Sequence, residues 1–382
     1  MERTVYDETH EEFRKSVRTF VEREITPHLM RWEREGITDR DIFYKAGAAG
    51  LLGMAVPEEY GGGGVDDFRF NAVRIEELCH AGALNGGRGI GLQADICIPY
   101  YLKWANEEQR RRWLPGLCSG EKIAAVAMTE PGTGSDLGAV STRAVRDGDH
   151  YVLNGSKMFI SSGILANLII VVCRTSDEGN GGVSLLVVED GMPGFERGRN
   201  LDKIGVHAQD TAELFFQDVH VPVENRLGEE NRGFRYLMDG LAQERLQIAL
   251  EAVAGAEAVF EETLQYTKQR HAFGQPIASF QNSRFVLATM RTELDIARIY
   301  MDQLLLAHVR KELTGEEAAQ AKWWTTELNF RTMDACLQLH GGYGYMEEYS
   351  IARHWRDSRV MRIGGGTTEI MKEIIGRRML GV

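Results

Sequence analysis

The chain has 382 residues, of which 43% are hydrophobic, and its formal net charge is −12 at pH 7. This length fits two or three domains with sizeable cores, and an acidic chain without a Lys/Arg-rich run is not expected to bind nucleic acid. The longest apolar runs, at residues 168–173 and 183–188, are far shorter than the ~20 residues that a membrane-spanning helix needs, so we expect a soluble protein.

Five cysteines are scattered along the chain, with no Cys-x-x-Cys pair and no histidine at ligand spacing. We therefore expect no metal site and no disulfide framework, but buried free thiols in a reducing compartment. The acidic first residues resemble neither a signal peptide nor a transit peptide. The last four residues match no prenylation or peroxisomal signal, and the cytoplasm is the simplest location.

Residues 1–122 are predicted to form a helical domain. Amphipathic patterns cover residues 9–32, 39–49 and 68–81, and a glycine-rich loop at 61–64 lies between the second and the third.

Residues 123–230 are predicted to form a small β domain, antiparallel and β-barrel-like. The period of the apolar residues changes to two in this region, and apolar runs alternate with turn residues. Asp147-Gly148 and Asn154-Gly155 are both hairpin signals.

Residues 231–382 are predicted to form a four-helix bundle, because the helical period returns. The helical runs lie near residues 234–269, 279–312, 316–340 and 366–378. The predicted fold class is therefore α+β multidomain, in the order helical domain, β domain, helical bundle.

Glu244 is the most unusual residue of the first bundle helix. It shares a helical face with Leu241, Ile248 and Ala252, at three- and four-residue spacings, so we expect it to be buried on an apolar stripe. A buried carboxylate must be paired, neutralised or used. An ion-pair network is one interpretation, since Glu251 flanks the same stripe, and a proton-transferring base is the other; this pattern alone leaves both open.

Four segments carry motifs that are specific in combination. Met128-Thr-Glu-Pro-Gly-Thr-Gly-Ser-Asp136 indicates a strand that enters a glycine-rich turn with free backbone amides. The other three are Lys157-Met-Phe-Ile-Ser-Ser-Gly163, Arg270-His-Ala-Phe-Gly-Gln-Pro276 and Gly364-Gly-Gly-Thr-Thr-Glu-Ile-Met371. With this set the chain resembles the acyl-CoA dehydrogenase family over nearly its whole length. Two further runs, at 208–216 and 228–234, are most similar to the long-chain members.

The resemblance implies an FAD enzyme that converts an acyl-CoA thioester to the trans-2-enoyl-CoA. A base removes the α proton while hydride leaves the β carbon for the flavin N5 atom, so a positioned base and a polarised thioester carbonyl are required. It further implies that electrons pass to electron-transferring flavoprotein, and that the enzyme is a homotetramer with FAD bound between subunits.

The resemblance also assigns residues to the cofactor. Around the isoalloxazine it places Met128, Thr129, Ser135, Phe159 and Ser161. For the pyrophosphate and adenine half, across a subunit interface, it places Arg270, Phe273, Gln281, Gln338, Gly341 and Gly342. Thr367 and Glu369 are placed near the adenosine part.

One departure from the family concerns the base. Many relatives carry it in a Tyr-Glu-Gly-Thr run, which here is replaced by residues 364–367, Gly-Gly-Gly-Thr. A branch of the family instead places the base before an arginine in the first bundle helix, as in Gln243-Glu244-Arg245. Gly365 keeps the backbone N–H that the family uses to polarise the thioester oxygen. The expected substrate-binding residues are thus Ser135, Arg245 and Gly365, with Glu244 as the catalytic base.

Two other functions stay open at this point. One is an oxygen-using flavin oxidase or monooxygenase on the same scaffold, and the other is a non-catalytic subunit of a hetero-oligomer. For the dehydrogenase, we expect a medium-to-long or branched acyl chain, because Gly364, Gly365 and the small residues of 85–91 leave room in the expected pocket. The alternative is that the glycines of 85–91 only permit close helix packing.

Overall fold

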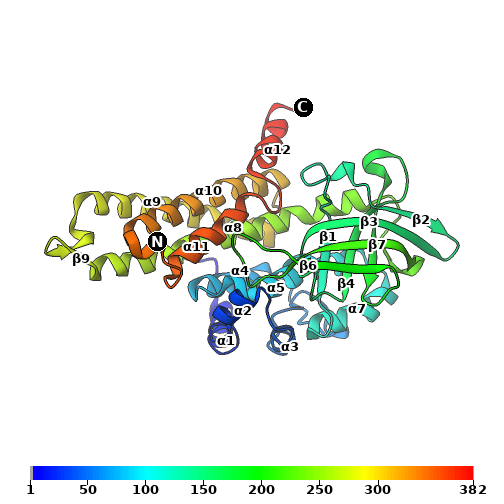
Figure 1. The fold of residues 1–382 in the computed structure, drawn as a ribbon, viewed down its shortest axis with the longest axis horizontal. Coiled ribbons are helices and arrows are strands. Elements are labelled where there is room, and N and C mark those ends of the chain that lie inside the picture. Colours follow the sequence, from blue (N-terminus) through cyan, green and yellow to red (C-terminus); the bar gives the residue numbers. More distant parts are fainter. Residues whose placement is uncertain (1–2, 382) are drawn as a thin grey trace.

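The structure is a computed structural model that describes residues 3–381 of the chain (Figure 1). The expected order of helical, β and helical regions is confirmed. Figure 1 shows the strands of the middle region gathered at one end of the molecule, and the long helices running from there to the other end. None of the described helices is long and apolar enough to cross a membrane.

The first region is helical, as predicted. Its α-helices are α1 (Glu8–Phe20), α2 (Leu29–Glu35), α3 (Asp41–Ala48), α4 (Phe68–His80), α5 (Leu84–Gly91), α6 (Ile98–Trp104) and α7 (Glu107–Ser119). The expected helix over 9–32 is divided, because a π-helical turn over Val21–Ile25 follows α1. Asp7 and Asn106 begin α1 and α7 as capping boxes, in which their side chains accept backbone N–H groups of the first turn.

The second region is one sheet, with its strands in the order β6-β7-β3-β2-β4-β5-β8. The strands are β1 (Ala124–Ala127), β2 (Arg143–Asp147), β3 (His150–Ser161), β4 (Leu168–Arg174), β5 (Val183–Glu189), β6 (Phe195–Asn200), β7 (Thr211–Pro222) and β8 (Arg226–Leu227). The expectation of a purely antiparallel sheet is wrong for β4, which pairs in parallel with β1 and, at one residue, with β2. Parallel pairing needs a long connection, and the segment with the β2–β3 hairpin supplies it between β1 and β4.

Only one of the two expected hairpin turns is present. Asp147 pairs with His150 across a two-residue turn at Gly148, whose φ is +61°, as predicted. Gly155 instead lies inside β3 at a register shift. A Cβ atom there would lie 2.6 Å from the Thr142 Oγ1 atom, so this glycine permits a close approach of β2 rather than a turn.

The third region contains the four expected helical runs. They are α8 (Gly233–Gln269), α9 (Gln281–Val309), α10 (Gly315–His340) and α12 (Thr368–Leu380). A fifth helix, α11 (Ser350–Ser358), was not expected and packs on α10. The small hairpin β9 (His271–Ala272) and β10 (Gln275–Pro276) joins α8 to α9 at the far end of the molecule (Figure 1).

Two hydrophobic cores share helix α8. One core joins the N-terminal helices and the sheet and reaches α8 at Leu237. The other joins α4, α8, α9 and α10 and begins on α8 at Leu246. No residue of α8 between Leu237 and Leu246, all of which the structure describes, belongs to either core. Glu244 lies in this interval, where the three regions of the chain meet.

Candidate active site

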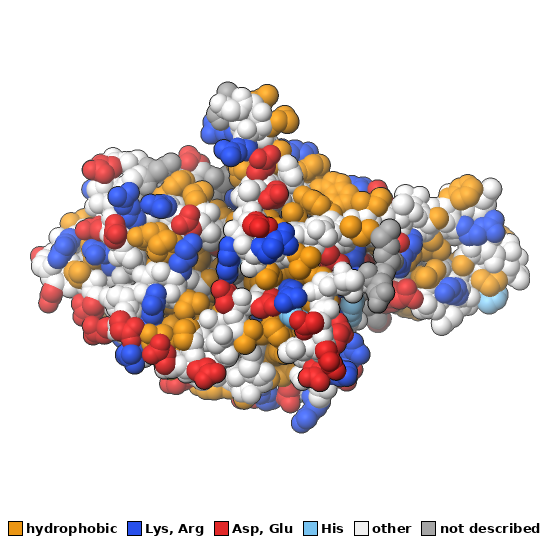
Figure 2. Space-filling view, turned by 180° about the vertical axis from the view of Figure 1, so that it is seen from behind, with side chains coloured by type: hydrophobic (Ala, Val, Ile, Leu, Met, Phe, Trp, Pro, Cys, Tyr) orange, Lys and Arg blue, Asp and Glu red, His pale blue; other side chains and the backbone are white. Residues whose placement is uncertain are grey.

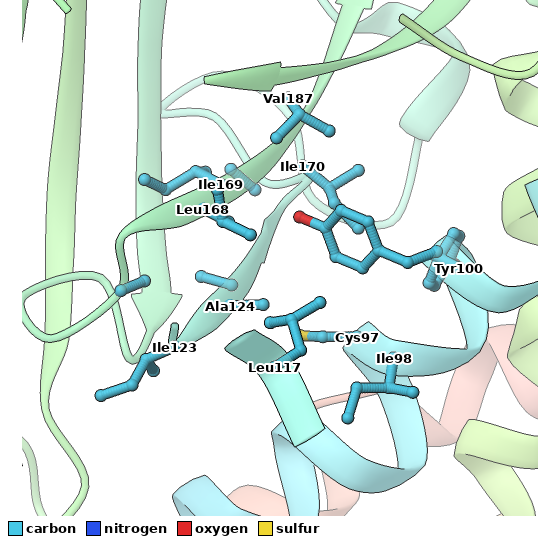
Figure 3. Packing of buried hydrophobic residues seen from close by; sticks show 14 of the residues in the cluster. Cys97, Ile98, Tyr100, Leu117, Ile123, Ala124, Leu168, Ile169, Ile170 and Val187 are labelled. Carbon is cyan, nitrogen blue, oxygen red and sulfur yellow. The ribbon is translucent and has the colours of Figure 1, made fainter. Parts of the chain in front are cut away.

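Glu244 is buried on α8, as its spacing predicted, with 6% of its surface exposed. The Tyr100 hydroxyl of α6 donates a hydrogen bond to Glu244 Oε1 at 3.1 Å. Gly240, one turn earlier on α8, admits the tyrosine, since a Cβ atom there would lie 2.9 Å from the Tyr100 hydroxyl oxygen. Figure 3 shows Tyr100 against Ile170 and Val187 of the sheet. The partner of Glu244 is thus fixed by both helix and sheet.

The electrostatics of Glu244 are those of a group poised near neutrality. Burial raises the pKa of Glu244 to about 7, and the Tyr100 hydrogen bond and the Arg245 charge oppose a larger rise. Within residues 3–381 Glu244 forms no salt bridge, whereas Glu251 lies 3.3 Å from Arg88. The ion-pair interpretation therefore fits Glu251 and not Glu244.

The Gly-Gly-Gly-Thr loop lies over this part of α8. A Cβ atom on Gly365 would lie 2.5 Å from the Cδ1 atom of Ile248, one turn beyond Glu244. Gly365 also has a φ of +67°, which side chains rarely adopt. The buried Lys322 of α10 holds the loop, because its ammonium group donates to the Gly366 carbonyl at 2.6 Å.

Arg245 follows Glu244 on α8 and is 7% exposed. Burial and the charge of Arg245 lower the pKa of Lys322 to about 8, so the two cations are close neighbours. The Nε atom of Arg245 has no hydrogen-bond partner among the residues that the structure describes. A buried guanidinium with spare donors is suited to binding an acceptor from outside the chain.

The first two motifs expected near the flavin are held together by a buried ion pair. The Met158 N–H donates to the Thr129 carbonyl at 2.9 Å. The Lys157 ammonium group donates to the Met128 carbonyl at 3.0 Å and to Glu130 Oε1 at 2.9 Å. Burial opposes ionisation of Glu130, but the Lys157 charge lowers its pKa to about 2. The sequence analysis did not predict the Lys157–Glu130 pair, which holds the 128–136 and 157–163 motifs against each other.

The 157–163 motif also carries an unusual aromatic side chain. Phe159 is 63% exposed and has a φ of +61°, at a bulge of β3. Cβ atoms on Gly132 and Gly134 would meet open space. Ser135 follows Gly134 in the chain, and Ser161 lies two residues after Phe159. A strained, exposed ring next to an open glycine turn is suited to packing on a planar group.

A second group of expected cofactor residues lies at the β9–β10 end of the helices, far from strand β3, which carries Phe159 (Figure 1). Arg270 lies over the ring of Tyr343, with its guanidinium carbon 5.1 Å from the ring centre. Phe273 has a φ of +50° and is 96% exposed. The remaining members at this end are Gln281, Gln338, Gly341 and Gly342. Within one chain, these residues therefore lie apart from the group expected to contact the flavin.

Thr367 and Glu369 form a third group at the start of α12. The Thr367 hydroxyl caps the helix by accepting the Ile370 N–H at 3.3 Å. Glu369 lies in the first helical turn. Both follow directly on the Gly-Gly-Gly loop at the start of α12, which Figure 1 shows away from the β9–β10 hairpin.

The glycines of residues 85–91 serve mainly for helix packing. At Gly86, Gly87 and Gly89, a Cβ atom would lie 2.9 Å or less from side chains of other helices. Only Gly91 faces the α8 side, where a Cβ atom would lie 3.3 Å from the Gln247 amide nitrogen. The packing alternative therefore holds for these glycines, including Gly91, and the expected space in the pocket is supported only at Gly364 of the tail loop, where a Cβ atom would meet no atom closer than 3.7 Å.

This combination of three regions and motifs matches known proteins from end to end. Three family models match consecutive parts of the chain: the acyl-CoA dehydrogenase N-terminal domain at residues 7–121, middle domain at 125–219 and C-terminal domain at 231–380. The chain therefore belongs to the acyl-CoA dehydrogenase family, as its motifs predicted, and it is an oxidoreductase.

The long-chain specific acyl-CoA dehydrogenase of pig mitochondria (Sus scrofa) is 46% identical over 381 residues, which are 99% of this chain and 88% of that protein. The crystal structure of an acyl-CoA dehydrogenase from Geobacillus kaustophilus is 48% identical and has a TM-score of 0.96, over 99% of this chain and 100% of that one. A glutaryl-CoA dehydrogenase from Mycobacterium smegmatis, in complex with FADH2, is 27% identical with a TM-score of 0.90, over 99% and 96% of the two chains. Acyl-CoA dehydrogenases are FAD enzymes, and the expected cofactor is confirmed at this level.

Proposed function

We propose that this protein oxidises an acyl-CoA thioester to the trans-2-enoyl-CoA, with Glu244 as the base that takes the α proton. The observation that carries the proposal is the state of Glu244: it is buried, forms no ion pair within residues 3–381, and has a pKa of about 7. A general base works best when its pKa lies near the working pH. FAD, when bound, supplies the acceptor for the hydride of the β carbon.

The environment of Glu244 supports proton transfer. Tyr100 donates to Oε1 only, so the second carboxylate oxygen is free of hydrogen bonds from described residues and can accept the α proton. The same tyrosine fixes the orientation of the carboxylate, which lowers the cost of reaching the reacting geometry. Burial keeps water from competing for the base.

The tail loop supplies the polarising group. The Gly365 N–H, carried by a left-handed residue, is the donor for the thioester oxygen, on which charge grows as the α proton leaves. Lys322 holds the next carbonyl and so fixes the loop. Arg245 offers a buried cation on the same side of α8, where it stabilises negative charge on the bound thioester.

FAD is bound between two copies of the chain. Met128, Thr129, Ser135, Phe159 and Ser161 hold the flavin in one subunit. Arg270, Phe273, Gln281, Gln338, Gly341 and Gly342 of a neighbour hold the pyrophosphate and adenine, with Thr367 and Glu369 near the adenosine. The separation of the two groups at opposite ends of one chain supports this arrangement (Figure 1).

The exposed surface supports assembly into a homotetramer. Figure 2 shows hydrophobic side chains on the narrow arm that carries the β9–β10 hairpin, and Phe273 and the α9 residues Phe285 and Ile296 are more than half exposed. Exposed apolar surface of this kind marks protein contacts. Because cofactor and assembly stabilise each other, we expect Arg270→Ala to lower FAD content and tetramer fraction together. A monomer with full FAD occupancy in sedimentation would contradict the shared site.

The acyl chain is medium to long, or branched. Gly364 and Gly365 leave the thioester end without side chains, and a Cβ atom on Gly364 would meet no atom closer than 3.7 Å. Each further buried methylene contributes roughly 0.8 kcal/mol, about fourfold in affinity. Catalytic efficiency should therefore rise over several carbons in a series of straight acyl-CoAs from four to eighteen carbons. A maximum at four carbons with a steep decline beyond would contradict this.

The physiological acceptor is electron-transferring flavoprotein. The deciding experiment measures oxidation of an acyl-CoA panel with an artificial electron acceptor, and then follows the reaction of the substrate-reduced enzyme with air. We expect turnover with the artificial acceptor and slow reoxidation by oxygen. Rapid reoxidation with peroxide formation would support an oxidase instead, and no reduction by any acyl-CoA would support a non-catalytic subunit.

A further inference from the structure

The polar face of α8 continues beyond Glu244. Gln247 and Glu251 follow at three and seven residues, which places all three on one side of the helix. The Gln247 amide donates to Glu251 Oε1 at 3.1 Å. Across from them, Arg88 of α5 brings its Nη1 atom within 3.3 Å of Glu251 Oε2. Asn329 of α10 lies at the next turn, beside Gly255.

This cluster has more hydrogen-bonding capacity than its own members use. The described residues offer no hydrogen-bond partner to three of its buried atoms, namely Arg88 Nε, Gln247 Oε1 and Asn329 Oδ1, and Glu251 Oε2 has only the ion-pair contact with Arg88. Gln247, Glu251 and Asn329 are each at least 95% buried. Buried polar atoms in folded proteins almost always have partners, so this cluster is suited to a polar occupant from outside the chain.

A cavity lies at the same place. Its volume is about 40 Å³, and Arg88, Glu251 and Asn329 line it together with Gly255, Met333 and Met361. By the measure in which one water needs roughly 10–15 Å³, it holds a few waters or one small polar group. A lining that contains both methionines and unpaired polar atoms fits the end of an apolar chain that carries such a group.

The charges around the cavity select the kind of group. Arg88 and Glu251 balance each other, and Asp357 is a second buried carboxyl in the lining. A carboxylate would therefore meet like charge, and an ammonium group would meet Arg88 and Arg353 of the lining. A hydroxyl can accept from Arg88 and donate to Glu251 at once. A neutral hydroxyl is the best match.

The distance to the base sets the position of that group. Seven residues of helix separate Glu244 from Glu251, which is roughly 10 Å. A zigzag carbon chain with bonds of about 1.5 Å covers that length in roughly eight bonds. Because the α carbon is the second carbon, the hydroxyl would lie near the ninth or tenth carbon when the α carbon is beside Glu244.

We propose that Arg88, Glu251 and Asn329, which line this cavity, select acyl-CoA substrates that carry a hydroxyl group near the distal end of the acyl chain, while Gln247 holds Glu251 from outside the lining. The proposal rests on the dehydrogenation proposed above and specifies its substrate. Arg88 and Glu251 are specificity residues here, and neither takes part in the proton transfer at Glu244.

The test uses the FAD-loaded enzyme and matched pairs of acyl-CoAs with eight, ten, twelve and fourteen carbons, each with a terminal methyl or a terminal hydroxyl. We expect kcat/KM to favour the hydroxyl form at least ~10-fold at one or two lengths, since a site built to bind a hydroxyl rejects the analogue without it. Replacing the pair by apolar residues of similar size, Arg88→Met with Glu251→Leu, should bring the ratio to one or below. Such swaps of buried ion pairs are often well tolerated.

Two further variants control the test. Glu251→Gln keeps the side-chain volume and should lower the hydroxyl preference even if the double variant does not fold. Arg111→Met, on the exposed side of α7, should leave the ratio unchanged.

The outcomes separate the two proposals. A wild-type ratio of one or less at every length, with good oxidation of the methyl-ended chains, would overturn the hydroxyl site and leave the dehydrogenase intact. A stronger preference for an ω-carboxylate of equal length would also overturn it, because Glu251 and Asp357 should repel that group. Absence of oxidation with every acyl-CoA would overturn the dehydrogenase proposal, and the hydroxyl site with it.

Discussion

Glu244 and Glu251 are two buried carboxyl groups on the same side of one helix, seven residues apart, and their surroundings differ. Glu244 has one neutral donor, Tyr100, and a pKa of about 7. Glu251 has a cation, Arg88, and an amide donor, Gln247. Burial alone therefore does not define a base. A carboxyl group that is left without an ion pair stays free to exchange a proton, whereas one held by a cation and an amide is suited to binding.

The largest expected effect separates these two groups by substitution. Glu244→Gln keeps volume and removes basicity, so flavin reduction by a straight-chain acyl-CoA should fall at least ~100-fold, with FAD content unchanged. Glu251→Gln should leave that rate within a few fold. Rapid-mixing absorbance of the flavin measures both, with the exposed Glu261→Gln of the same helix as control. Equal losses in the Glu244 and Glu251 variants would remove the distinction between them.

The stability of the enzyme should depend on pH through Glu244. Its pKa is raised from 4.5 to about 7 in the folded chain. Below pH 4.5 the Glu244 carboxyl is protonated in both the folded and the unfolded chain, so it does not change the free energy of unfolding. Between pH 4.5 and pH 7 the unfolded chain binds fewer protons than the folded chain, so the free energy of unfolding falls as pH rises. Above pH 7 the loss is complete, at most about 3 kcal/mol.

Glu244→Gln should abolish this loss. Urea unfolding should show a variant that is more stable than wild type at pH 8 and equal to it at pH 4.5. A variant of equal or lower stability at pH 8 would mean that Glu244 ionises without penalty in the folded protein.

The rate of flavin reduction should rise with pH in wild type, because only the ionised carboxylate can take the α proton. With a pKa of about 7, the rate should increase tens of fold between pH 5 and pH 8 and then level off. Stopped-flow reduction at saturating substrate measures it. A rate independent of pH over this range would indicate that proton transfer is not limiting or that Glu244 is already ionised at pH 5.

Moving the base to the tail loop should restore little activity. The pair Glu244→Gly and Gly365→Glu places the carboxylate where many relatives carry it. Gly365, however, has a φ of +67° and Ile248 Cδ1 occupies the Cβ direction, so the new side chain is strained. We expect recovery of no more than about 10-fold over Glu244→Gly alone, as measured by turnover, and a larger recovery when Ile248→Ala is added. Full recovery without that change would show that the loop adapts freely.

The sequence predicted the features that depend on local spacing. The face of α8 that buries Glu244, the long helices and the order of the three regions all follow from periods of apolar residues. Contacts between distant segments were not predictable in this way. Tyr100 of α6 reaches Glu244 only because Gly240 leaves space on α8. Gly155 was predicted to form a turn from its neighbours in the sequence, but its contact with Thr142 explains why a glycine is needed there.

Buried charges were the other omission. The spacing of residues around Lys157 and Lys322 does not predict that either lysine is buried. The role of each lysine follows only from its contact with a distant carbonyl acceptor, Met128 for Lys157 and Gly366 for Lys322. The nine-residue helix α11 was missed although it is strongly amphipathic, because it is shorter than the roughly 11–18 residues over which a helical period is counted. The prediction for the glycines of α5 was partly wrong for a related reason. The sequence alone does not distinguish a glycine that borders a cavity from one that contacts another helix.

The central claim, that Glu244 removes the α proton, is tested most directly by proton exchange without oxidation. A 3-thia-acyl-CoA carries sulfur at the β position, so it has acidic α protons but no β hydrogen to leave as hydride. In D2O, wild-type enzyme should exchange the α protons of this analogue for deuterium, as followed by NMR, and Glu244→Gln should reduce the exchange rate at least ~100-fold. Exchange at the wild-type rate in Glu244→Gln would contradict the assignment of the base.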